Sequence, residues 1–139
     1  MVGLARARLA PYGARTSVSQ SDASLRFPAA DGSFDRFVST YVLDLLSRAD
    51  IERALREAHR VLVPGGLAGI TSLTFGRDLL GRAVSTLWGA VHRLSPRRVG
   101  GCRPLDVEPF FVAPGWTVFY SQTHRASGLT SQVLVARRS

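Results

Sequence analysis

The clearest pattern of apolar and polar positions lies between residues 50 and 63. Its apolar members follow at steps of three or four, which places them on one face of a helix: Ile51, Leu55, Ala58, Val61 and Leu62. The opposite, solvent face is predicted to carry Glu52, Arg53, Arg56, Glu57 and Arg60. Asp50 is a candidate N-cap, and Pro64 cannot continue a helix. The helix is therefore predicted to end near Val63, with Gly65 or Gly66 at a positive φ.

The stretch "LAGITSLT", residues 67–74, follows this helix and is rich in apolar and β-branched residues. That composition is typical of a strand covered on both faces, as in parallel sheets. A helix followed by such a strand predicts one unit of a doubly wound α/β fold.

The same patterns predict the other elements. Residues 2–10 form a helix with Leu4, Ala5 and Leu9 on one face, and "PYG" ends it. A short strand is expected at 16–22, a buried strand running into a helical turn at 34–46, and a second amphipathic helix at 77–94. A short helix interrupted by prolines is expected within 105–116. Residues 116–125 and 131–138 are predicted to pair as a hairpin turned by 126–130.

Length and composition predict a single domain over residues 1–139, since 45% hydrophobic and 20% charged residues can bury one core. No apolar run reaches the roughly 18 to 20 residues of a membrane span, and no signal-peptide pattern opens the chain, so a cytoplasmic protein is expected. Cys102 is the only cysteine, which excludes an internal disulfide and a multi-thiolate metal site.

The net charge of +8 raises the question of nucleic-acid binding. All 18 basic residues are arginines, and they are scattered. Clusters occur only at Arg97, Arg98 and Arg103 and at Arg137 and Arg138, without the interleaved aromatic residues that a stacking surface needs. A solvated basic face is the favoured interpretation, and nucleic acid is not an expected partner.

Two stretches carry a family resemblance: "SDASLRFPAADGSFDRFVSTYVLDLL", residues 21–46, and "RALREAHRVLVPGGLAGITSLT", residues 53–74. In this order they resemble the second half of class I S-adenosylmethionine-dependent methyltransferases, in particular the ubiquinone and menaquinone C-methyltransferases. The resemblance implies a Rossmann-like, doubly wound, mostly parallel sheet with a C-terminal antiparallel hairpin. It also implies S-adenosylmethionine as cofactor and a small molecule as methyl acceptor.

The resemblance assigns cofactor contacts to six residues. Asp22, with Ala23 behind it, stands where the family binds the adenine amino group, and Leu25 stands at the adenine wall, although Arg26 replaces an expected proline. The methionine part of the cofactor would be contacted from the carboxyl end of the fourth family strand, by Ser39, Thr40 and Tyr41. The alternatives are a turn-stabilising role for the aspartate and strand packing for the others.

Methyl transfer needs donor and acceptor to be held at near-attack distance, so a general base is optional. Candidate bases are Asp44, Tyr41, His92 and His124. Each has a structural alternative, because an aspartate can cap a helical turn and histidines are often surface residues. No metal-ligand cluster, hydrolase triad or P-loop pattern is present.

The resemblance leaves one part of the family pattern unmatched. A glycine-rich turn after the first strand and an acidic residue after the second are absent, so the chain is predicted to lack those two strands and to be truncated at its N-terminus. In the family these strands lie between the third strand, here 16–22, and the fourth, which would leave an open strand edge. Two hypotheses follow. The chain is a methyltransferase completed by an N-terminal fragment or a homodimer, or it is a noncatalytic α/β module that pairs through this edge.

Overall fold

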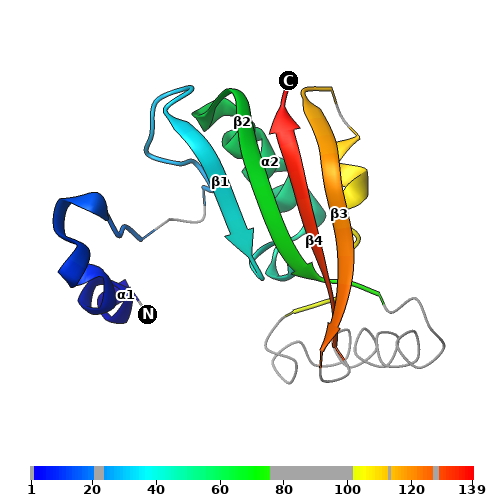
Figure 1. Ribbon diagram of the computed structural model, residues 1–139, viewed down its shortest axis with the longest axis horizontal. Coiled ribbons are helices and arrows are strands. Elements are labelled where there is room, and N and C mark those ends of the chain that lie inside the picture. The colour runs from blue at the N-terminus through cyan, green and yellow to red at the C-terminus, as the bar shows by residue number, and fades with distance from the viewer. Residues whose placement is uncertain (1, 21–23, 76–101, 113, 127–128) are drawn as a thin grey trace.

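The computed structural model describes residues 2–20, 24–75, 102–112, 114–126 and 129–139. Their elements, in chain order, are α1 (Val2–Leu9), η1 (Ala10–Arg15), β1 (Phe34–Thr40), η2 (Leu43–Leu45), α2 (Arg48–Val61), β2 (Leu62–Leu73), η4 (Glu108–Phe111), β3 (Trp116–Ala126) and β4 (Leu129–Arg138). The strands form one four-stranded sheet in the order β1-β2-β4-β3 (Figure 1). β1 and β2 are parallel, whereas β4 is antiparallel to both of its neighbours. The predicted α/β class and the C-terminal hairpin are confirmed. The helix predicted over 77–94 lies outside the described residues.

Helix α2 carries the predicted apolar stripe, and its buried residues are Ile51, Ala54, Leu55, Ala58 and Val61. Its start differs from the prediction. Ser47 is the N-cap: its hydroxyl accepts a hydrogen bond from the Asp50 N–H at 3.2 Å and donates to the Asp50 carboxylate at 2.7 Å. The prediction of Asp50 as N-cap is wrong because a serine three residues earlier forms this capping pair, with Asp50 inside the first turn.

Strand β2 begins directly after α2 and includes the Pro64-Gly65-Gly66 turn. Phe34 of β1 pairs with Leu62, but Arg36 pairs with Leu67, so residues 63–66 bulge out of the ladder. Gly65 has a φ of 80°, as predicted, a conformation that suits glycine because it has no Cβ. The predicted helix stop therefore forms a bulge within the strand, and α2 ends at Val61, slightly earlier than expected.

The core lies on one face of the sheet. Ala68 and Ile70 of β2 and Leu134 and Ala136 of β4 are all fully buried there. The helical elements and the 102–112 segment cover this face, as shown by their share of the core cluster: Leu43, Ile51, Leu55, Leu105, Val107 and Phe111.

The other face, at the front in Figure 1, is not covered by any of the described helices. Along β2 the residues alternate between buried and half-buried, and Val38 of β1 is 75% exposed. The sequence predicts that both faces of β2 are covered and that the residues of β1 are buried. Within the described residues neither expectation holds, because α2, η2 and η4 all pack on the same side.

The N-terminal helix α1 is confirmed, but it buries no residue, and Leu4 is 69% exposed. Residues 16–20 of the strand predicted at 16–22 belong to no strand, and residues 21 and 22 lie outside the described part. The prediction fails over 16–20 because a strand needs a hydrogen-bonded neighbour. Among the described strands β1 pairs with β2 alone, so residues 16–20 have no strand beside them.

Candidate functional site

The carboxyl ends of the parallel strands β1 and β2 form the candidate site, since ligands of open α/β sheets bind there. Ser39 is only 7% exposed, whereas its neighbour Thr40 is exposed. Successive strand residues point to opposite faces, so Ser39 faces the core and Thr40 faces the open side of the sheet. Of these two predicted cofactor contacts, only Thr40 presents its hydroxyl to solvent, and Ser39 could contact a ligand only through its backbone.

Tyr41 directly follows β1 and has a left-handed backbone conformation with a φ of 52°, which is rare for a bulky residue. Its N–H donates to the Thr71 carbonyl at 2.8 Å, and this bond holds the turn against the end of β2. Such outliers cluster at functional sites, where the surrounding structure maintains the strain.

The side chain of Tyr41 reaches across the end of the sheet. Its hydroxyl lies 3.0 Å from the Ser131 Oγ on β4, and Ser131 is paired with His124 on β3. Residues directly opposite in an antiparallel ladder have Cβ atoms about 4.5 to 5.5 Å apart. Tyr41, Ser131 and His124 thus form a polar row along this rim. Two of the four candidate bases belong to it, and His92 lies outside the described residues.

Sequence reasoning missed Ser131 because its contact with Tyr41 depends on the strand order, which places β4 beside β2. No local motif marks this serine. The only available signal was the predicted hairpin, which already placed the serine at the start of its second strand.

Asp44 connects η2, which follows β1, to the carboxyl end of β2. It is fully buried in η2, and its Oδ2 accepts a hydrogen bond from the N–H of Leu73, the last residue of β2, at 3.1 Å. Its Oδ1 has no hydrogen-bond partner in the described part of the chain. Burial raises the pKa of this carboxyl, and the bond from Leu73 and the charge of Arg103 oppose the rise. Asp44 therefore anchors the site and is not accessible as a base.

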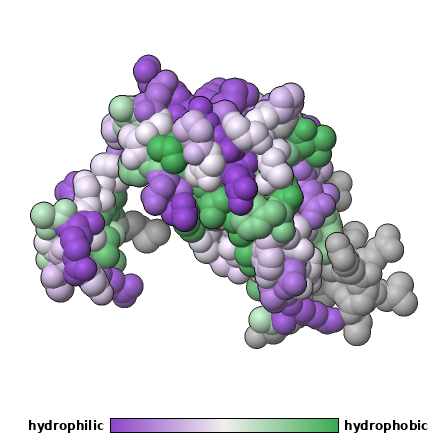
Figure 2. Space-filling model, turned by 45° about the horizontal axis from the view of Figure 1, so that its top comes forward, coloured by the Kyte–Doolittle hydropathy of each residue, from purple (hydrophilic) through white to green (hydrophobic). Residues whose placement is uncertain are grey.

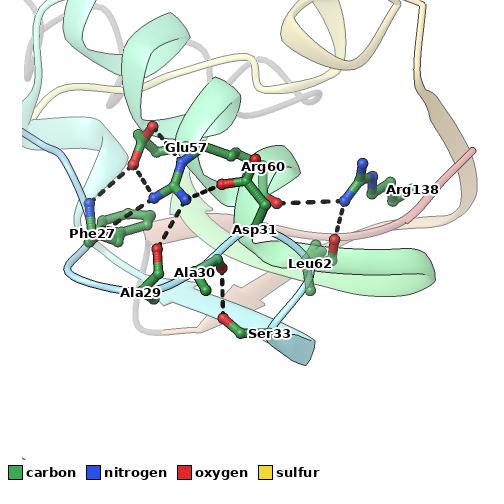
Figure 3. Close-up of polar contacts among 9 residues, drawn as sticks. All are labelled: Phe27, Ala29, Ala30, Asp31, Ser33, Glu57, Arg60, Leu62 and Arg138. Atoms are coloured by element: carbon green, nitrogen blue, oxygen red, sulfur yellow. Dashed lines mark hydrogen bonds and ion pairs between the residues drawn. The ribbon is translucent and has the colours of Figure 1, made fainter.

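A clasp of polar groups fixes the link that leads into β1 (Figure 3). The Arg60 guanidinium donates to the carbonyls of Phe27 at 3.1 Å and Ala29 at 2.9 Å, and to the Asp31 carboxylate at 2.6 Å. It also forms bonds of 3.0 and 2.9 Å to Glu57, whose carboxylate accepts from the Phe27 N–H at 3.1 Å. We call Arg60, Glu57 and Asp31 the link clasp. The clasp determines where residues 27–31 lie and therefore how the chain enters β1.

The link clasp corrects the prediction that Glu57 and Arg60 belong to a solvent face. Their side chains are only 18% and 25% exposed. The hydrogen bonds from Arg60 lower the pKa of Glu57 to about 2, with burial opposing the shift. The sequence signal that could have identified the clasp is a glutamate and an arginine three apart on one helix face, but the pattern does not show that a distant loop supplies carbonyls to them.

The adenine side of the predicted site is described in part. Asp22 and Ala23 lie outside the described residues. Leu25 is half-buried and has a φ of 55°, and the next residue, Arg26, donates its N–H to the Ser24 Oγ at 3.2 Å. The link clasp holds the chain two residues further on, at Phe27. Leu25 thus sits in a sharp turn just before the clasped segment.

The described residues contain no cluster of three or more side chains that could hold a metal ion. Among the same residues, no helix is long and apolar enough to cross a membrane.

Comparison with known proteins agrees with this geometry. A family model for a methyltransferase domain matches residues 1–66. A putative methyltransferase from Bacillus halodurans superposes with a TM-score of 0.72 at 12% identity, covering 98% of this chain and 78% of its own. The fold is that of the methyltransferases. An S-adenosylmethionine-dependent methyltransferase structure from Methanosarcina mazei gives a TM-score of 0.66 at 16% identity, with 94% of this chain and 76% of the other covered.

A third methyltransferase structure was solved with bound ligands. The 1,6-didemethyltoxoflavin-N1-methyltransferase of Burkholderia thailandensis, with 1,6-didemethyltoxoflavin and S-adenosylhomocysteine, gives a TM-score of 0.68 at 15% identity. The alignment covers 96% of this chain but only 55% of that protein. No curated protein matches the chain in sequence. The methyltransferase fold is thus shared over nearly the whole chain, while the relatives contain additional structure.

Proposed function

We propose that this chain takes part in transferring a methyl group from S-adenosylmethionine to a small molecule of the kind methylated by ubiquinone and menaquinone C-methyltransferases. The observation that carries the proposal is the polar, strained carboxyl end of β1, located where methyltransferase folds bind their ligands. The methyltransferase-domain match and the neighbour that contains S-adenosylhomocysteine support it.

The described residues fit one end of this cofactor. The exposed Thr40 hydroxyl can hold the polar methionine part, and the left-handed turn at Tyr41 follows it directly at the strand end. Leu25 would contact the adenine, as would Asp22 and Ala23. When bound, S-adenosylmethionine would supply an electrophilic methyl group on sulfur.

The polar row suits the acceptor side. The Tyr41 hydroxyl, oriented by Ser131, can bind an oxygen or nitrogen of the acceptor, and the exposed His124 can accept a proton near the same rim. The main role of these side chains would be to orient the acceptor, because holding the methyl donor and the acceptor in line can supply much of the rate acceleration.

The test is a calorimetric titration of the chain with S-adenosylhomocysteine, which binds the same pocket without reacting. We expect saturable binding in the micromolar range, weakened about tenfold in Thr40→Ala, the loss of one hydrogen bond. Thr117→Ala is the control, because Thr117 lies at the far end of β3 and bonds to Ser139. Binding unchanged in Thr40→Ala, or absent from a folded wild-type chain, would refute the assignment for this chain.

A second function is favoured by the exposed edge of β1: a noncatalytic module that associates through strand pairing. The two functions are compatible, because relatives with the same fold contain structure beyond the part they share with this chain. The edge is considered next on its own evidence.

A further inference from the structure

The free edge of β1 presents unpaired backbone groups. Within the described part of the chain, β1 is a terminal strand of the sheet, with β2 on one side only. Because the Tyr41 N–H is directed to β2, the alternation of a strand directs the backbone N–H and C=O of Thr40, Val38 and Arg36 away from β2. Such a row is a template for another strand.

A cavity lies directly beside this edge. It has a volume of about 680 Å³, and one wall is formed by Phe34, Phe37 and Val38 of β1 with Phe27 of the link. Residues 14–17 and Ser19 of the N-terminal segment line it as well. Figure 2 shows the corresponding hollow between the N-terminal residues and the body of the sheet.

The N-terminal wall is an extended stretch of chain that belongs to none of the described strands. Thr16 has β-region dihedrals, φ −131° and ψ 141°, and the Val18 carbonyl is bonded by the side chain of Arg6 at 3.3 Å, not by a strand. The cavity therefore lies between the outward backbone groups of β1 and an extended segment of the chain. A small molecule would leave most of the outward groups of β1 unpaired, whereas an extended peptide would satisfy them.

We propose that this cavity is a strand-addition site, in which an extended segment of a partner protein pairs with the free edge of β1. The chemistry of the cavity specifies the segment. The aromatic and aliphatic wall favours apolar residues at alternate positions, and Arg15 and Arg36 at the lining favour acidic residues next to them. The net charge of +8 favours an acidic partner in the same way.

A separate protein is favoured over a second copy of this chain. Residues 14–19 of each copy stand beside its own β1 edge, so two β1 strands could meet only if both N-terminal segments moved aside. A single extended segment can enter without this rearrangement. Among the described residues, no proposed cofactor contact lines the cavity, although the outward backbone of Thr40 belongs to the same strand edge, and the inference does not depend on the proposed reaction.

The experiment uses the peptide Glu-Val-Thr-Val-Thr-Val-Glu, labelled with a fluorophore, and measures anisotropy together with the amide spectrum of the chain. The test variant is Val38→Pro, which removes the outward N–H but leaves the bonds to β2, a position where an edge strand tolerates proline. Val38→Thr, which keeps both the N–H and the branched side chain, is the matched control. Circular dichroism establishes that both variants are folded.

We expect saturable binding to the wild type, at least about tenfold weaker binding to Val38→Pro, and Val38→Thr within about threefold of the wild type. Amide shifts are expected at Arg36, Val38 and Thr40, and a peptide with lysine in place of glutamate is expected to bind more weakly. Equal binding by a folded Val38→Pro, or no saturable binding up to millimolar peptide, would overturn the proposal. A wild-type dimer that dissociates in Val38→Pro would also overturn it, because the occupant would then be a second copy.

Discussion

Replacing Arg60 by methionine tests whether the link clasp holds the structure together. The substitution keeps an unbranched apolar stem while removing every hydrogen bond from the guanidinium. The carbonyls of Phe27 and Ala29 lose a charged donor, and Glu57 is left with its carboxylate largely buried.

The size of the expected change in the free energy of unfolding depends on how exposed the side chains of the link clasp are. Hydrogen bonds to charged groups contribute about 1.5 to 3 kcal/mol each, but Arg60 is 25% exposed and water can replace part of the loss, so we assign about 1 kcal/mol to each carbonyl. The unpaired Glu57 adds about 1 kcal/mol, while Asp31, at 80% exposure, contributes little. We expect the free energy of unfolding to fall by about 3 kcal/mol, and the Tm by about 10 °C.

The assay is urea denaturation followed by circular dichroism and tryptophan fluorescence. Arg56→Met is the matched control, because Arg56 lies on the same helix and is exposed; it is expected to change the free energy of unfolding by less than about 0.5 kcal/mol. If Arg60→Met and Arg56→Met unfold at the same urea concentration, the clasp contributes nothing and the link must be held in another way.

Three further predictions concern the free energy of unfolding. Because the folded pKa of Glu57 is about 2, below its usual 4.5, its stabilisation is present above pH 4.5 and is lost as the pH falls toward 2; a pH series of denaturation curves is expected to show a flatter acid limb in Glu57→Gln. Gly115→Ala is expected to cost about 2 kcal/mol or more, since Gly115 has a φ of 101° and the added Cβ would lie 2.7 Å from the His59 Nε2; a Tm equal to that of the wild type would contradict this. Burial raises the folded pKa of Asp44, so the contribution of this carboxyl to the free energy of unfolding is favourable below the unfolded pKa and is lost as the pH rises. Asp44→Asn is therefore expected to be neutral or stabilising at pH 7. Asp44→Ala leaves the Leu73 N–H unpaired and is expected to cost about 1 to 3 kcal/mol.

Much of the fold is predictable from the sequence because its elements are determined by local patterns. The stripe from Ile51 to Val61 predicts α2, and the alternation after Ser131 predicts β4, whose buried members include Gln132, Leu134 and Ala136. The start of α2 was misplaced because two capping residues, Ser47 and Asp50, stand three apart and either can begin a helix on sequence grounds.

The sequence predicts only the part of the candidate site that lies at the end of a single strand, β1. Thr40 and Tyr41 follow from the position of the β1 end, and the structure places them there. The Tyr41–Ser131 contact and the link clasp join residues 90 and about 30 positions apart, and such contacts depend on strand order and loop path. Neither property has a local pattern, because the carbonyls that Arg60 binds exist at every position of the chain.

β1 is more exposed than its sequence predicts. Its sequence predicts a buried strand, yet Phe34 is 49% and Val38 75% exposed, and the neighbouring Val42 is 48% exposed. Apolar residues along an unpaired edge promote aggregation, and monomeric proteins usually protect such edges with charges, prolines or bulges. β1 has one Asp-Arg pair near its start, the bulge of the ladder lies on β2, and the second half of β1 is therefore unprotected. The apolar residues of β1 would be buried if another strand paired with this edge, which is the physical reason to expect strand addition there. For the same reason, we expect the isolated chain to aggregate when no partner occupies the edge.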